Sequence, residues 1–147
     1  MFYNTDDLKT DEIYLKLTET IDENKEKGYV PAYVFKICRT GDNVEVGNCN
    51  LRVGHNKNTY YGGNIGYGID APYRGNHYAG KACLMLFELA KHHKMEYVLI
   101  ACNPDNIASR KSCEFADCIL ESIVDLPPDN DRYLEGDRQK CIYRFEI

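Results

Sequence analysis

The segment from residue 65 to residue 94 constrains the fold of this chain more than any other. An apolar strand at residues 65–69 leads through a loop that contains Gly75 and Gly80 into an unbroken helical segment. Such a loop can turn its backbone N–H groups inward, and the start of a helix adds unpaired donors and the positive end of a dipole. The arrangement therefore predicts a site for phosphate groups, and a nucleotide-bearing cofactor is the first hypothesis.

A P-loop is one interpretation of this segment. Gly75, Gly80 and Lys81 match its spacing. Ala82, however, stands where a nucleotidase needs a Ser or Thr hydroxyl to hold Mg²⁺. The next strand ends in residues 103–104, Asn-Pro, and supplies no carboxylate for the metal. These two gaps argue against a P-loop nucleotidase.

A dinucleotide-binding fingerprint is the second interpretation. It needs G-x-G-x-x-G at the opening of the helix, but Gly66 and Gly68 lie inside the strand. Ala71 occupies the position of the third glycine. This interpretation therefore fails.

The loop instead resembles the acyl-CoA loop of the GNAT N-acetyltransferases, Arg/Gln-x-x-Gly-x-Gly/Ala, which here reads Arg-Gly-Asn-His-Tyr-Ala at residues 74–79. Residues 103–110 resemble the N-x-x-S segment that opens the next helix in that family. The two motifs occur in order at a family-like separation and cover residues 59–120. The chain is identified as a member of this family, and the resemblance implies acetyl-CoA as cosubstrate.

Hydrophobic periodicity predicts an α+β fold. The expected strands are residues 12–21, 32–39, 44–53, 59–69, 96–102, 119–126 and 140–147, and the expected helices are residues 78–93 and 106–116. The resemblance implies one domain over residues 1–147, with a single mixed, mostly antiparallel sheet, splayed central strands and flanking helices. Only about ten residues separate the first two strands, where GNAT members often have two helices, so we expect a more open acceptor side.

The resemblance also implies a set of cofactor-binding residues. The backbone of Tyr67, Gly68 and Ile69 would bind the pantetheine arm as an added strand does. The pyrophosphate would lie on the amides of Gly75, Asn76, His77, Tyr78, Ala79 and Gly80, with charge from Arg74 or Lys81. Asn106 and Ser109 would contact the cofactor from the opposite wall, although Asn106 also fits a plain helix cap and Ser109 a first-turn hydroxyl.

Three positions depart from the family pattern. His77 replaces a glycine that allows close approach of the backbone to pyrophosphate in a conformation that is costly for other residues. Cys113 stands where many members carry the tyrosine that protonates the departing thiolate, and residues 117–118, Asp-Cys, replace Gly-Phe. At His77 the expected consequence is weaker cofactor binding, or else a loop that tolerates the residue with its imidazole turned outward to solvent. At Cys113 it is a different general acid.

Acetyl transfer to an amine requires a neutral nucleophile, stabilisation of an oxyanion and a proton for the thiolate. Backbone N–H groups near Gly68 are the candidates for the oxyanion. A water held by Asn64, or the carboxylate of Glu45, is the candidate base. Cys113 and Tyr133 are the candidate acids.

The loop from residue 125 to 137 carries five carboxylates around Tyr133. We expect it to select a small-molecule or peptide amine, in particular a cationic one such as a polyamine, although a solvated acidic turn is the alternative. The net charge of −5 weakly suits such an acceptor and disfavours a nucleic-acid partner.

The seven scattered cysteines include no C-x-x-C pair, which favours reduced thiols over a disulfide framework or zinc cluster, and no metal is expected. No apolar run approaches the roughly 20 residues of a membrane span, and no signal peptide is recognised at the N-terminus, so a cytoplasmic protein is expected.

Two other classes of function stay open at this stage. A non-catalytic acyl-CoA-binding module would also bind CoA but would turn over no amine. A pure interaction protein would bind no CoA. Pairing of edge strands is compatible with a homodimer in such folds.

Overall fold

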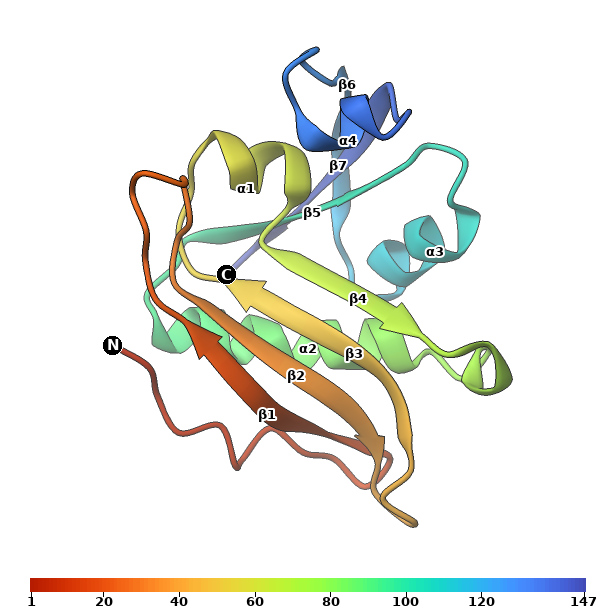
Figure 1. Ribbon diagram of the computed structural model, residues 1–147. Helices are drawn as coiled ribbons and strands as arrows, with labels where there is room; N and C mark the ends of the chain where they lie inside the picture. Colours follow the sequence, from red (N-terminus) through yellow and green to blue (C-terminus); the bar gives the residue numbers. More distant parts are fainter.

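Seven strands and a few short helices surround one long helix in the computed structural model, which describes residues 1–147 (Figure 1). In chain order the elements are β1 (Ile13–Ile21), β2 (Ala32–Arg39), β3 (Glu45–Arg52), α1 (Lys57–Gly62), β4 (Ile65–Ile69), the 3-10 turn η1 (Ala71–Tyr73), α2 (Tyr78–His92), β5 (Tyr97–Cys102), α3 (Ile107–Phe115), β6 (Ile119–Asp125), α4 (Asp131–Leu134) and β7 (Gln139–Glu146).

The strands form two hydrogen-bonded groups. β1, β2, β3 and β4 pair in that order as an antiparallel meander, and β7 lies between β5 and β6 in a second antiparallel group. β4 and β5 begin near each other, run in the same direction and diverge (Figure 1). The predicted α+β class and mostly antiparallel sheet with splayed central strands are confirmed, and the splay is wide enough to divide the hydrogen-bonded ladder.

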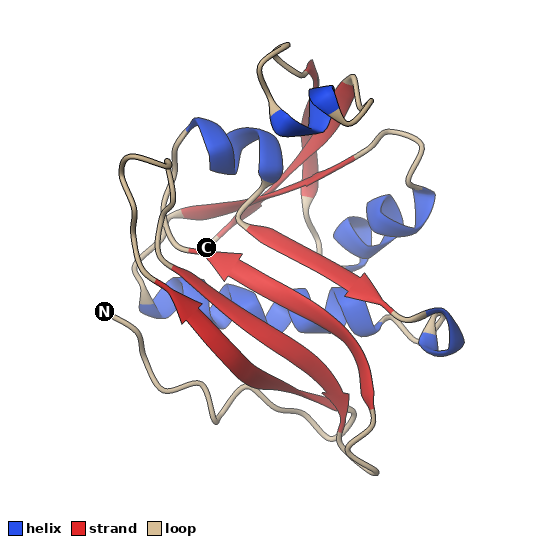
Figure 2. Ribbon diagram, viewed as in Figure 1, coloured by secondary structure: helices blue, strands red, loops and turns tan.

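α2 forms the core with the inner face of the sheet, which it crosses in Figure 2. Ala82, Cys83, Leu86 and Ala90 recur at helical spacing and are fully buried. Complete burial of a side chain the size of leucine contributes roughly 1.5–3 kcal/mol. The periodicity that predicted a core-packed helix over residues 78–93 is therefore confirmed to within one residue.

The prediction of a strand beginning at Thr59 is wrong, because residues 57–62 form α1 and the strand begins only at Ile65. Asn56 caps α1: its Oδ1 accepts from the Thr59 N–H at 2.9 Å, and the Thr59 hydroxyl accepts from the Asn56 N–H at 2.8 Å. This reciprocal capping box satisfies two donors that a strand would have to pair elsewhere. The local cap therefore decides in favour of a helix.

Residues 22–31, between β1 and β2, contain no helix, so the expected short connection is confirmed. The seven cysteines are all buried free thiols. No helix combines the length and the apolar character that crossing a membrane requires.

Candidate active site

Asn64 fixes the point at which β4 and β5 separate. Its backbone N–H donates to the Leu99 carbonyl of β5 at 2.6 Å, and its Oδ1 accepts from the Leu99 N–H at 2.8 Å. Its Nδ2 donates to the carbonyls of Arg52 and Gly54 at 3.1 and 2.7 Å. The side chain is fully buried, and both amide hydrogens are used. Asn64 therefore has no donor left to hold a catalytic water, and we expect it to act structurally.

Beyond Asn64 the two strands leave a gap. β4 pairs only with β3, so the backbone groups of residues 66–69 that face β5 have no strand partner. Unpaired polar groups on a strand edge can bind an extended amide-containing chain as an additional strand would. A pantetheine arm, which contains two amides, has this character.

The loop at the open end of this gap presents a row of backbone donors. No N–H group of residues 75–80 donates to an acceptor within the protein, and the first such bond in α2 runs from Lys81 N–H to the His77 carbonyl at 2.9 Å. Free N–H groups at a helix N-terminus favour an anion, and the helix dipole adds to this preference. The sequence-predicted phosphate loop thus has the geometry of an anion cradle.

The two candidate cations at the cradle are placed differently. Arg74 Nε donates to the Ile69 carbonyl at 2.9 Å, which holds the exposed guanidinium beside the end of β4 and leaves its terminal nitrogens without a protein partner. Lys81 Nζ, in contrast, forms an ion pair with Glu12, just before β1. Arg74 is therefore the cation more available to a phosphate.

His77 is in the left-handed conformation that the glycine of the family pattern would favour, with φ of 59° and ψ of 25°. Its imidazole stacks on Phe115 of α3, with ring centroids 4.5 Å apart and ring planes at 10°. Phe115 also lies against Gly80, where a Cβ would come within 2.4 Å of its ring. The ring contact explains how a residue with a Cβ is accommodated here.

We expect His77→Gly to change the stability of the protein by less than about 1 kcal/mol. Relief of a left-handed residue gains about 1–2 kcal/mol, and loss of the aromatic contact costs about 0.5–1.5 kcal/mol. Because the imidazole lies against Phe115, the CoA dissociation constant should change by less than about threefold, or 0.7 kcal/mol. Urea unfolding and calorimetric titration measure the two effects. A much tighter CoA complex in the variant would show that His77 obstructs the cradle.

The opposite wall of the gap is the start of α3. Asn106 is its N-cap and accepts from the Ser109 N–H at 3.1 Å. The Ser109 hydroxyl lies 2.7 Å from the hydroxyl of Tyr67, which reaches across from β4. Cys113, one turn further along α3, places its Sγ 3.5 Å from the same phenol. The structure thus brings Tyr67, Ser109 and Cys113 together.

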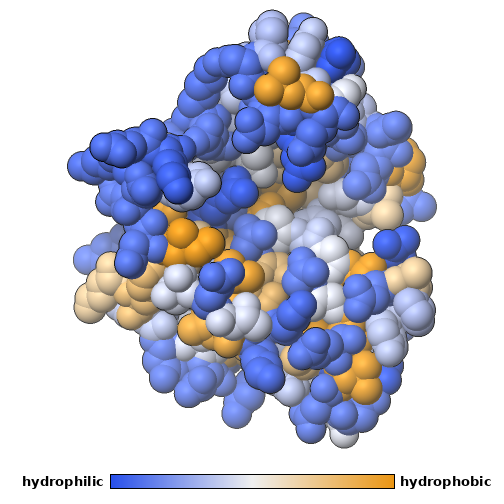
Figure 3. Space-filling view, in the orientation of Figure 1, coloured by the Kyte–Doolittle hydropathy of each residue, from blue (hydrophilic) through white to orange (hydrophobic).

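A cleft of about 1190 Å³ opens beside this cluster (Figure 3). Tyr67, Asn106 and Ser109 belong to its lining, together with parts of β3, α1, β5 and the loop between β1 and β2. Its rim also includes residues 129–132 and 137 of the loop between β6 and β7. The cleft is the natural place for an acceptor, because it meets the gap between β4 and β5 at the Tyr67 hydroxyl.

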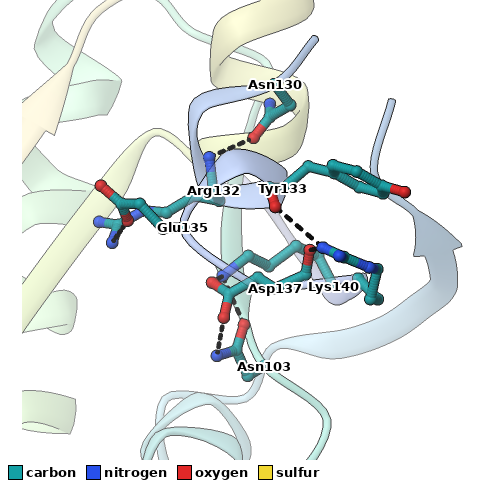
Figure 4. A network of polar contacts seen from close by, with 8 residues as sticks. Asn103, Asn130, Arg132, Tyr133, Glu135, Asp137 and Lys140 are labelled. Carbon is teal, nitrogen blue, oxygen red and sulfur yellow. Dashed lines mark hydrogen bonds and ion pairs between the residues drawn. The ribbon is translucent and has the colours of Figure 1, made fainter. Parts of the chain in front are cut away.

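Two of the predicted catalytic residues lie elsewhere. Tyr133, in α4, is not part of the cleft lining, and its ring points away from the Asn103 and Lys140 side chains (Figure 4). The guanidinium carbon of Arg138 lies 3.9 Å from the centre of that ring. Glu45 is exposed at the start of β3 and does not line the cleft either.

Sequence reasoning missed the side chains of three residues at the site. Tyr67 was expected to contribute through its backbone, Arg52 was not considered, and Lys140 was treated only as part of a strand. Lys140 is almost completely buried, and its Nζ donates to Asn103 Oδ1 at 2.6 Å and to Asp137 at 3.2 Å (Figure 4). The Asn103-Pro104 segment after β5 was the only available signal, because the contact of Lys140 with Asn103 joins residues 37 positions apart.

The profile of the acetyltransferase (GNAT) domain family matches residues 1–117, and the chain belongs to this family. No curated protein is significantly similar to it in sequence.

Several solved acetyltransferase structures share the fold. The ribosomal L7/L12 α-N-protein acetyltransferase RimL with coenzyme A gives a TM-score of 0.67 at 17% identity, over 94% of this chain and 96% of that one. The microcin C7 self-immunity acetyltransferase MccE, with acetyl-CoA and AMP, gives 0.63 at 20% identity over 79% of this chain and 61% of that one. A GNAT acetyltransferase from Bacillus anthracis gives 0.60 at 18% identity over 77% and 65%. The chain spans less than two thirds of the last two structures.

Proposed function

We propose that the protein is an N-acetyltransferase that moves an acetyl group directly from acetyl-CoA to an amine. The row of unpaired N–H groups at residues 75–80, at the open end of the gap between β4 and β5, carries this proposal. The cradle and Arg74 would bind the pyrophosphate, and the free edge of β4 would bind the pantetheine arm. The thioester then lies where the gap meets the cleft, with N–H groups near Gly68 directed at the oxyanion.

A relative of known structure supports an amine acceptor. RimL is a ribosomal L7/L12 α-N-protein acetyltransferase, whose acceptor atom is an α-nitrogen. The amine must be neutral when it attacks. Since neither Asn64 nor Glu45 offers a base in the cleft, we propose that the amine loses its proton to water there.

The charged side chains that line the cleft change the prediction of which acceptor binds there. Its lining includes five cations and three carboxylates: Lys27, Arg52, Lys57, Arg132 and Lys140 against Asp129, Asp131 and Asp137. Asp129 pairs with Lys57 at 3.7 Å, and Asp137 pairs with Lys140 at 3.2 Å. Arg52 forms no ion pair. We therefore propose an amine that carries a carboxylate or phosphate, in place of a purely cationic acceptor.

Two measurements test these proposals in turn. Calorimetric titration with acetyl-CoA and CoA tests the cofactor, and we expect binding. Release of the CoA thiol is then followed with matched amines that differ by one carboxylate, such as lysine and cadaverine. We expect the higher kcat/KM with lysine, and Arg52→Gln should reduce the difference. A preference for cadaverine would contradict the anionic acceptor, and CoA binding without turnover of any amine would favour the binding module.

A further inference from the structure

The hydroxyl of Tyr67 lies at the start of α3, between the cleft and the gap between β4 and β5. The side chain starts on β4, crosses to α3 and places its Oη 2.7 Å from Ser109 Oγ and 3.1 Å from the Ser109 carbonyl oxygen. Cys113 Sγ lies 3.5 Å away. Tyr67 and Ser109 both line the cleft, whereas Cys113 is fully buried behind them. The phenol therefore faces both the cleft and the gap that would hold the pantetheine arm.

Cys113 is poorly suited to protonate a thiolate. A thiol is a weak hydrogen-bond donor. Because Cys113 has no exposed surface, its proton is also not accessible to a molecule in the cleft. The phenol that lies against its sulfur is both a better donor and accessible.

We propose that Tyr67 is the general acid of this protein. Its phenol, on β4, would protonate the departing thiolate in place of the tyrosine that many family members carry at the position of Cys113 in α3. The inference rests on the proposed acetyl transfer. It adds a residue whose side chain the sequence motifs did not indicate.

The proposed step is balanced as follows. The lone pair of the neutral amine forms the C–N bond at the thioester carbonyl carbon, and the ammonium proton passes to water in the cleft. When the C–S bond breaks, its electron pair moves to sulfur, and the sulfur takes the Tyr67 proton. Ser109 Oγ donates to the phenolic oxygen as that oxygen loses its proton, and water then returns a proton to it. The products are the amide and the CoA thiol.

The surroundings keep Tyr67 protonated until this step. Burial is the largest cause that raises the pKa of Tyr67, and Cys113 and Cys83 of α2 add to the rise. No charged side chain forms an ion pair or hydrogen bond with the phenol. The same burial raises the pKa of the nearby Cys113 thiol. A thiolate that departs into this environment would be destabilised likewise, so burial raises the proton affinity of the phenol and of the departing sulfur together.

The test is Tyr67→Phe, which keeps the ring and removes only the hydroxyl. We expect kcat for acetyl transfer to fall on the order of 100-fold, as for loss of a general acid, while the Kd for CoA changes by less than about threefold. Tyr33→Phe is the matched control. Tyr33 lies in β2 and is fully buried, and its hydroxyl bonds to His93 at 2.6 Å outside the cleft. This control should keep the wild-type kcat.

A second variant separates proton donation from packing. Replacement of Tyr67 by 3,5-difluorotyrosine preserves the ring and the hydroxyl, so kcat should stay within about tenfold of wild type and well above that of Tyr67→Phe. A kcat for Tyr67→Phe within about threefold of wild type, or a difluorotyrosine variant as slow as Tyr67→Phe, would overturn the inference. Failure of the proposed function itself is distinct, because the wild-type protein would then release no CoA thiol with any amine.

Discussion

Asn64→Ala should destabilise the protein by several kcal/mol, on the order of 4 kcal/mol, because it leaves one buried and two partly buried backbone groups without partners. These groups are the Leu99 N–H and the carbonyls of Arg52 and Gly54. Each unsatisfied group costs about 1–3 kcal/mol, and a loss of this size is a large fraction of a typical domain's stability. The midpoint of urea unfolding should therefore fall steeply with an unchanged slope.

Asn48→Ala is the control for this change. Asn48 lies on β3, which Asn64 contacts, but its side chain is exposed and makes no hydrogen bond within the protein. Its replacement should alter the free energy of unfolding by no more than about 0.5 kcal/mol. Equal effects of the two substitutions would show that the contacts of Asn64 do not hold β3, β4 and β5 together.

Arg74→Ala should raise the CoA dissociation constant at least about tenfold. A hydrogen bond to a charged group contributes about 1.5–3 kcal/mol, and 1.4 kcal/mol corresponds to a factor of ten. The terminal guanidinium nitrogens are free, and the bond from Nε to the Ile69 carbonyl holds them beside the cradle. Calorimetric titration at two salt concentrations measures the loss, which should shrink at high salt as screening weakens the contact.

Lys81→Ala is the matched comparison, since it removes one positive charge from the same loop. Lys81 already pairs with Glu12, and a new phosphate contact would require that pair to break. We therefore expect its CoA dissociation constant to rise less than about threefold. A larger effect for Lys81→Ala than for Arg74→Ala would assign the phosphate contact to Lys81 instead.

Much of the fold follows from local patterns along the chain. Alternation predicted β1 to within one residue, and three- and four-residue spacing predicted α2. The error at α1 has a local cause, because an Asn-x-x-Thr cap outweighs the apolar and aromatic residues that follow it. The division of the sheet between β4 and β5 could be expected only from the family resemblance. The hydrophobic pattern of a single strand does not show which neighbouring strand it fails to pair with.

Some features of the candidate site could likewise be predicted from the sequence, and others could not. The strand, loop and helix at residues 65–94 are consecutive, so the backbone cradle could be predicted from the sequence. The role of His77 could not, since its left-handed conformation depends on a ring contributed by Phe115 of α3. The acidic loop was expected to attract a cationic amine, but two of its aspartates pair with Lys57 and Lys140. Its net effect on an acceptor depends on these partners.

By itself the sequence determined the order and type of most elements, the cradle for phosphate and the family to which the chain belongs. These properties depend on residues that are neighbours along the chain. Only the tertiary structure decided that Asn64 joins three strands, that the Tyr67 hydroxyl meets Ser109 and Cys113, and that cations outnumber carboxylates in the cleft. The physical reason is that hydrogen bonds and charges act over a few ångströms of space, and the two hydroxyls of the Tyr67–Ser109 contact come from residues 42 positions apart.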